Sequence, residues 1–88
     1  MASYKLLVRT SVRKDLRVLP REVLTRVLRQ FESLANDPLP KGSLKLAGSE
    51  HRYRIRVGEY RIVYELRLDT GEVIIHYVRH RREAYRQR

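Results

Sequence analysis

The sequence predicts an α+β domain in which two helices cover one face of a sheet, in the order β-α-α-β-β-β with a short helix at the C-terminus. Apolar residues recur at helical spacing in the first half of the chain and alternate with polar residues at strand spacing in the second. Short glycine-containing turns join the alternating stretches. The 88 residues leave room for one domain, residues 1–88, and 42% of them are apolar, which is enough for a folded core.

The first half is predicted to supply one strand and both helices. Residues 4–9 alternate as a strand, and Thr10 or Ser11 can cap a short helix after it. Pro20 suits the first turn of a second helix, because its missing N–H is no loss there. The second helix ends at Asn36-Asp37-Pro38. Its apolar stripe consists of Val23, Leu24, Val27, Leu28, Phe31, Leu34 and Ala35.

The second half is predicted to supply three neighbouring strands. Residues 37–49 contain Pro, Gly and Ser and are expected to form a connection; strands follow over residues 52–57, 60–68 and 73–78. The last is apolar on both faces except at His76, so it is expected inside the sheet, with His76 as a hydrogen-bonded core histidine. The helix-facing side is expected to carry Tyr53, Ile55, Val57, Tyr60, Ile62, Tyr64, Leu66, Ile74 and Val78.

Two turns predict how these strands pair. Val57-Gly58-Glu59-Tyr60 fits a two-residue hairpin with Gly first, as a type II′ turn prefers. Asp69-Thr70-Gly71 fits a three-residue turn with Gly in the left-handed position. Counting outward from the second turn, Tyr64 is expected to face His76.

The same count places three arginines in one row, because Arg56 faces Arg61 and Arg61 faces Arg79. Arg54 lies two residues from Arg56 on the same face. Two like charges about 5 Å apart repel by roughly 3 kcal/mol at an effective dielectric of 20, so the row is a poor choice for stability alone. It is favourable if a phosphate lies over it, since the arginine fork suits that ligand. A solvated polar face with splayed arginines is the alternative, and a β-bulge would move Arg79 to the other face.

The overall charge indicates a polyanionic partner such as RNA, DNA or an acidic protein. Lys and Arg number 20 against 10 Asp and Glu, a net charge of +10. Around the row, nucleic-acid backbone contacts are expected from Lys41, Lys45, Arg81, Arg82 and Arg86.

Two further side chains are candidates for the site. Tyr85 could stack on a base if the C-terminal helix folds over the polar face, or it could pack on the rim of the sheet. His80 ends the last strand beside the row, where it could act as a general acid or base. No cofactor or metal is expected, because the chain has no Cys and its three His lack metal-ligand spacing. No apolar run is long enough to span a membrane or to form a signal peptide, so the cytoplasm is the expected location.

Essentially the whole chain resembles the RelE toxins of bacterial and archaeal toxin–antitoxin modules. The motifs that carry this resemblance are the strand Tyr60-Arg61-Ile62-Val63-Tyr64 and its preceding Arg-rich strand, with the terminal His80-Arg81-Arg82-Glu83-Ala84-Tyr85. Lys14-Asp15-Leu16 and Leu19-Pro20 in the early helices agree with it. The resemblance implies a twisted, mainly antiparallel sheet with the helical hairpin on one side.

The activity implied by the resemblance is ribosome-dependent, metal-independent cleavage of mRNA in the A site. The 2′-OH of the mRNA attacks the adjacent phosphate and leaves a 2′,3′-cyclic phosphate and a 5′-OH. By resemblance, Arg61 is the transition-state phosphate ligand, Arg79 the leaving-group acid or a second phosphate ligand, and Tyr85 the base-stacking residue. Arg54 and Arg56 occupy positions where well-studied members have two lysines, the second a proposed general base.

The arginine at position 56 leaves the general base open. Arginine has a pKa above 12 and is a poor base, so charge stabilisation and positioning can carry catalysis, or His80 or Glu59 can take the proton.

A different activity also fits the fold. ParE toxins share it and poison DNA gyrase by binding, and their members usually lack the Arg/Arg/Tyr set that is present here. A plain RNA-binding domain is a further alternative. An acidic, RelB-like antitoxin is the expected partner, alongside ribosome and mRNA, in a toxin–antitoxin hetero-oligomer.

Overall fold

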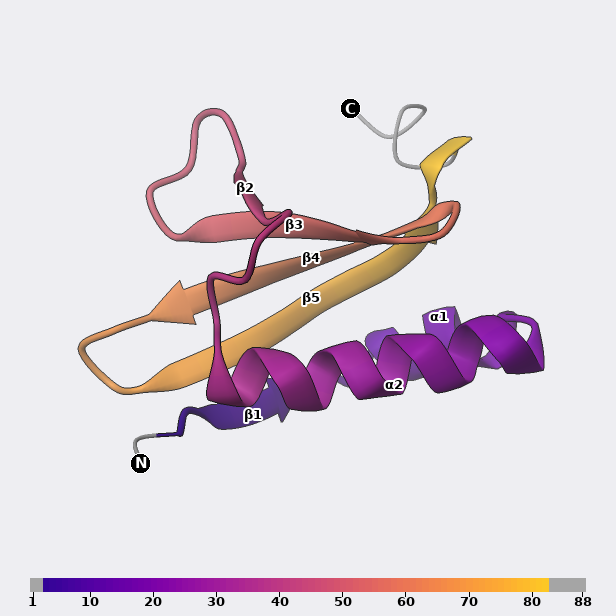
Figure 1. Ribbon diagram of the computed structural model, residues 1–88, viewed down its shortest axis with the longest axis horizontal. Coiled ribbons are helices and arrows are strands. Elements are labelled where there is room, and N and C mark those ends of the chain that lie inside the picture. The colour runs from indigo at the N-terminus through magenta and orange to yellow at the C-terminus, as the bar shows by residue number, and fades with distance from the viewer. Residues whose placement is uncertain (1–2, 83–88) are drawn as a thin grey trace.

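The computed structural model describes residues 3–82 and confirms the α+β fold. The elements are β1 (Lys5–Val8), α1 (Val12–Arg17), α2 (Arg21–Asn36), β2 (Leu44–Lys45), β3 (Arg52–Val57), β4 (Tyr60–Arg67) and β5 (Glu72–His80). The strands form one sheet in the order β1-β5-β4-β3-β2; β1 and β5 are parallel and the other pairs are antiparallel. Both helices lie together on one side of the twisted sheet (Figure 1).

Three local features differ from the prediction or lie beyond the described residues. The short strand β2 lies within the stretch expected to be a plain connection, where two residues are too few to produce an alternating pattern. Ser11 precedes α1, but its side chain makes no capping hydrogen bond. The predicted C-terminal helix falls largely on residues 83–88, outside the described part of the chain.

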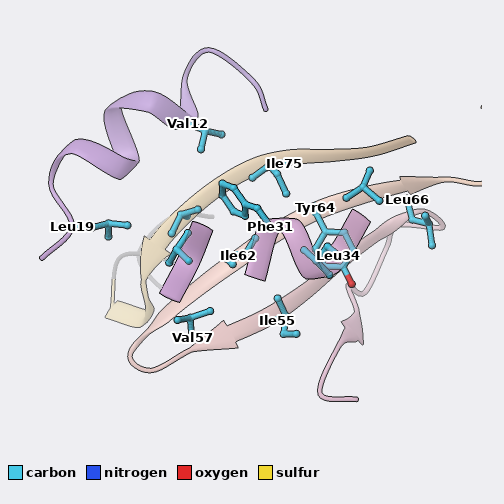
Figure 2. Close-up of a cluster of buried hydrophobic side chains, with 13 residues drawn as sticks. Val12, Leu19, Phe31, Leu34, Ile55, Val57, Ile62, Tyr64, Leu66 and Ile75 are labelled. Carbon is cyan, nitrogen blue, oxygen red and sulfur yellow. The ribbon is translucent and has the colours of Figure 1, made fainter. Parts of the chain in front are cut away.

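The core lies between α2 and the helix-facing side of the sheet. Val27, Phe31 and Leu34 of α2 are buried, and Figure 2 shows Phe31 and Leu34 facing strand residues such as Ile62 and Tyr64. Leu28 was expected in this stripe, but it is 44% exposed because it lies at the edge of the helix face. Within residues 3–82, neither helix is both long and apolar enough to cross a membrane.

Tyr64 connects the core to the segment that follows α2. Its hydroxyl donates a 2.7 Å hydrogen bond to the carbonyl of Pro38, and its ring stacks on Tyr53 with centroids 6.0 Å apart. Burial raises the pKa of Tyr64 to about 12, so this hydroxyl stays protonated as a donor. The contact anchors the connection that leads to Lys41 and β2.

A β-bulge in β5 corrects part of the predicted register. Tyr64 faces Ile75 rather than His76, and Arg67 faces Glu72, so the turn has four residues instead of three. Gly71 has φ of 70°, the left-handed conformation that was predicted for it. The irregularity lies between Val63 and Tyr64 of β4, opposite His76, which is the extra residue.

The bulge changes which residues of β5 face the helices. Val73 and Ile75 are fully buried in the core, whereas Ile74, which was expected there, is only partly buried. Because His76 is the extra residue of the bulge, Val78 on its other side also faces the core, as Val73 and Ile75 do. Packing of apolar residues on both sides of the bulge therefore explains its position.

Candidate functional site

The predicted row of arginines is present on the face of the sheet that is turned away from the helices. Arg56 faces Arg61 across β3 and β4, and Arg61 faces Arg79 across β4 and β5. Strands lie about 4.8 Å apart, so the row spans roughly 10 Å. Arg54 faces Val63 one step along the same face. The bulge lies between the β4–β5 turn and Arg79, and its extra residue offsets the extra residue of the turn, so Arg79 stands on the predicted face.

The three arginines of the row differ in their exposure to solvent. Arg56 on β3 is exposed, whereas Arg61 and Arg79 are half-buried, and the Nε atom of Arg61 is fully buried. A guanidinium that is held against the sheet keeps its direction, and partial burial lowers the local dielectric. An anion above Arg61 would therefore meet cationic groups from three neighbouring strands.

Tyr77 is a member of this face that the site prediction omitted. It faces Val63, and the guanidinium carbon of Arg79 lies 4.6 Å from the centroid of its ring. This cation–π contact orients Arg79 from the side of β5. The alternation of Tyr77 with Val78 was the available signal for its position.

Glu59 and Arg81 lie close together at the end of the sheet beside the row. The backbone N–H of Arg81 donates to the carbonyl of Glu59 over 2.9 Å, which continues the β4–β5 ladder past the row. The side chains of these two residues form an ion pair, with Arg81 Nη1 3.4 Å from Glu59 Oε1. Together with His80 and Arg82 they line a depression of about 640 Å³. Figure 1 shows the β3–β4 turn and the end of β5 lying together at this end of the sheet.

His80 does not point to the same face as the arginine row. It faces Tyr60, and the two rings meet edge to face with centroids 5.2 Å apart. Its Nδ1 accepts a 3.2 Å hydrogen bond from the backbone N–H of Arg82. Adjacent residues of a strand point to opposite faces, so the neighbour of Arg79 turns away from the row and the expected acid–base position is not formed.

The predicted basic rim is reproduced in part. Lys41 lines a depression of about 480 Å³ together with Arg54 and Arg56, so it lies beside the row. Lys45 faces Tyr53 and therefore projects from the helix-facing side of the sheet edge. Tyr85 and Arg86 lie outside the described residues.

His76 at the bulge has hydrogen-bond partners, as predicted, but they lie outside the core cluster. Arg9 Nη1 is 3.0 Å from its Nδ1, and its Nε2 is 2.9 Å from Glu65 Oε1. A guanidinium can only donate, so Nδ1 accepts and the ring N–H at Nε2 donates to Glu65. This hydrogen bond, helped by the positive charges of Arg67 and Arg52, lowers the pKa of Glu65.

Replacing Glu65 with glutamine is expected to remove a pH-dependent part of the stability. Because the pKa of Glu65 is lower in the folded state, its ionised form stabilises the fold above the ordinary carboxyl pKa. That contribution disappears as the pH falls through the folded-state value. Urea unfolding midpoints from pH 7 to pH 3 should show the wild type losing its advantage over E65Q on acidification. A constant difference between the two proteins would contradict the account.

Comparison with known proteins agrees with the fold described above. A family model described as the ParE toxin of the type II toxin–antitoxin system parDE matches residues 6–85. A curated relative, the putative toxin RelE1 of Methanocaldococcus jannaschii, is 35% identical over 78 residues, which cover 85% of this chain and 87% of the relative. This chain belongs to the RelE/ParE toxin family. It is a toxin of a type II toxin–antitoxin system.

Solved structures of RelE toxins superpose on nearly the whole chain. The RelB–RelE antitoxin–toxin complex of Methanococcus jannaschii gives a TM-score of 0.79 at 30% identity, with 93% of this chain and 98% of that chain covered. The toxin–antitoxin complex RelBE2 of Mycobacterium tuberculosis gives 0.78 at 29% identity, with 91% and 93% covered. The RelE/ParE fold inferred from the sequence is therefore confirmed.

Proposed function

We propose that this toxin is a metal-independent endoribonuclease that cleaves mRNA in the ribosomal A site. The observation that carries the proposal is the row of Arg56, Arg61 and Arg79 across three neighbouring strands. Like charges in register are unfavourable for a sheet, and the guanidinium forks suit the several oxygens of a phosphate. Exposed sheet surface around it leaves room for a nucleic-acid strand.

Positioning and positive charge are the main contributions of the arginine row to the proposed reaction. The 2′-OH of the mRNA attacks the adjacent phosphorus, the bond to the 5′ oxygen breaks, and the products are a 2′,3′-cyclic phosphate and a 5′-OH. Negative charge grows on the non-bridging oxygens as the new bond forms. Arg61, in the middle of the row, and Arg79, oriented by Tyr77, stabilise that charge. Arg54 and Lys41 bind the neighbouring backbone.

Inhibition of DNA gyrase by binding is the second candidate function. The observation that favours it is the match to a family model described as a ParE toxin. A toxin that acts only by binding has no need for three arginines in register. The row therefore favours the nuclease hypothesis.

An acidic, RelB-like antitoxin is the proposed partner, and the cytoplasm is the proposed location. The net charge of +10 favours binding to a partner with negative charge. The superposed relatives were solved as RelB–RelE and RelBE complexes. An antitoxin segment on the arginine face would cover the row and block the reaction.

The proposed chemistry is tested by the ends of the cleaved RNA. Purified toxin, ribosomes and a labelled mRNA should yield 5′-OH ends, which polynucleotide kinase labels without prior phosphatase treatment. The matching 3′ ends should resist periodate until the cyclic phosphate is removed. Fragments with 5′-phosphate ends would rule out attack by the 2′-OH.

Removing the peripheral charge of Lys41 is expected to weaken association without stopping chemistry. K41A should raise the concentration needed for half-maximal cleavage several-fold, with a shallower dependence on salt, while the saturated rate stays close to that of the wild type. Lys5 on β1, at the opposite edge of the sheet, provides the matched control K5A. A loss of the saturated rate in K41A would place this lysine in the reaction itself.

A further inference from the structure

The proposed reaction requires a group that takes the proton from the attacking 2′-OH. Arg56 is in place to bind the phosphate, but a guanidinium stays protonated and has no lone pair to offer. His80 faces the other side of the sheet, and its Nδ1 is occupied by the backbone N–H of Arg82. The arginine face must therefore supply another base if the proposed function is correct.

Glu59 lies at the end of the sheet next to the row. It occupies the β3–β4 turn two residues before Arg61, which corresponds to about 6.7 Å along a strand. Arg81 follows the end of β5, and the Glu59 carboxylate reaches its guanidinium at 3.4 Å. The Glu59 side chain is 65% exposed, so the carboxylate is accessible to a substrate.

The turn and the strand ladder hold this carboxylate at the end of the row. Gly58 has φ of 59°, which lets the two-residue turn close with Val57 opposite Tyr60. The 2.9 Å hydrogen bond from Arg81 N–H to the Glu59 carbonyl ties the turn to the end of β5. The backbone of Glu59 is thus held from both β4 and β5.

The other carboxylates that the ladder places on this face are occupied and distant. Glu65 is bonded to His76 and Arg67, two steps from the row in the other direction. Glu72 faces Arg67 at the far end of β4 and accepts a 2.9 Å hydrogen bond from the Thr70 hydroxyl. Asp15 lines a hollow with Arg79, but its carboxylate already accepts a 3.0 Å hydrogen bond from the backbone N–H of Val78. Within residues 3–82, Glu59 is the exposed carboxylate at the end of the sheet beside the row.

We propose that Glu59 is the general base of the cleavage reaction, an inference that rests on the proposed function. Its carboxylate takes the proton of the 2′-OH while the 2′ oxygen bonds to phosphorus. The bond from phosphorus to the 5′ oxygen breaks, and the leaving oxygen takes a proton from water. The resulting hydroxide removes the proton from Glu59, which restores the enzyme. The Arg81 ion pair orients the carboxylate and is released as the carboxylate turns to the hydroxyl.

The test uses chemical rescue on programmed ribosomes. Removing a general base typically costs 10²–10⁴ in rate, so E59A should cleave about 10²-fold or more slowly than the wild type. Added formate, a small carboxylate that fits the vacated space, should restore E59A at least tenfold and should leave R61A inactive. E50A removes an equally charged, 89% exposed side chain and should match the wild type. Thermal melts check that each variant is folded.

The possible outcomes distinguish a failure of the role proposed for Glu59 from a failure of the proposed function. Wild-type rates in E59A, with the wild type active, would overturn the role of Glu59 and leave the nuclease intact. Slow cleavage by folded E59A that formate fails to rescue would show that Glu59 acts only by holding Arg81. A wild-type protein that does not cleave mRNA would overturn both proposals.

Discussion

Replacing Arg61 with alanine is expected to reduce mRNA cleavage by about 10²–10³-fold, which corresponds to the loss of one donor to the transition-state phosphate. Arg61 is the middle member of the row and faces arginine on both sides. The same replacement relieves repulsion between like charges, so the urea midpoint is expected to stay equal or to rise. Single-turnover cleavage rates and urea unfolding measure the two effects on the same preparation.

The control is R13A, which removes the same charge from an exposed position on α1. It should change neither the cleavage rate nor the urea midpoint by much. Full activity in R61A would remove the row from the reaction. Loss of activity together with unfolding would show that Arg61 acts through the fold instead.

Replacing Phe31 with alanine is expected to lower the free energy of unfolding by about 3–5 kcal/mol, the largest effect on stability. Phe31 is 3% exposed and lies between α2 and the sheet (Figure 2). The loss combines removal of buried apolar surface with the cavity that remains. Since small domains are stable by only about 5–15 kcal/mol, F31A should lose a large part of its stability and unfold at a much lower denaturant concentration. Chemical denaturation at low temperature gives the difference directly.

L28A is the matched control on the same helix. Leu28 is 44% exposed, so its truncation should cost well under half as much as that of Phe31. Equal losses of unfolding free energy in F31A and L28A would contradict the packing of α2 described above.

The arginine row could be predicted from the sequence because a tight turn determines strand pairing. Gly58 placed first in a two-residue turn allows one register, and that register sets Arg56 opposite Arg61. Arg79 stands opposite Arg61 as predicted because the extra residue of the bulge offsets the extra residue of the β4–β5 turn. The count that located the row also places Tyr77 opposite Val63, as observed, whereas the expected acid–base role of His80 did not take into account that alternation turns His80 to the other face.

The bulge itself could not be located from the sequence. The stretch of β5 from Glu72 to Arg79 has one residue more than the stretch of β4 that it pairs with, and an extra residue can be absorbed at several places. Packing against α2 decides the place, because Val73 and Ile75 are buried only if the shift occurs at His76. Contacts between distant segments, such as that of Glu59 with Arg81, likewise depend on the folded chain.

The most direct test of the nuclease function is primer-extension mapping of an mRNA translated on purified ribosomes with the wild-type toxin. We expect cuts phased to codons in the A site, absent without ribosomes and strongly reduced in R61A. The contradicting result is an intact mRNA at toxin concentrations that trap DNA gyrase on its substrate, which would assign this chain to the binding-only toxins.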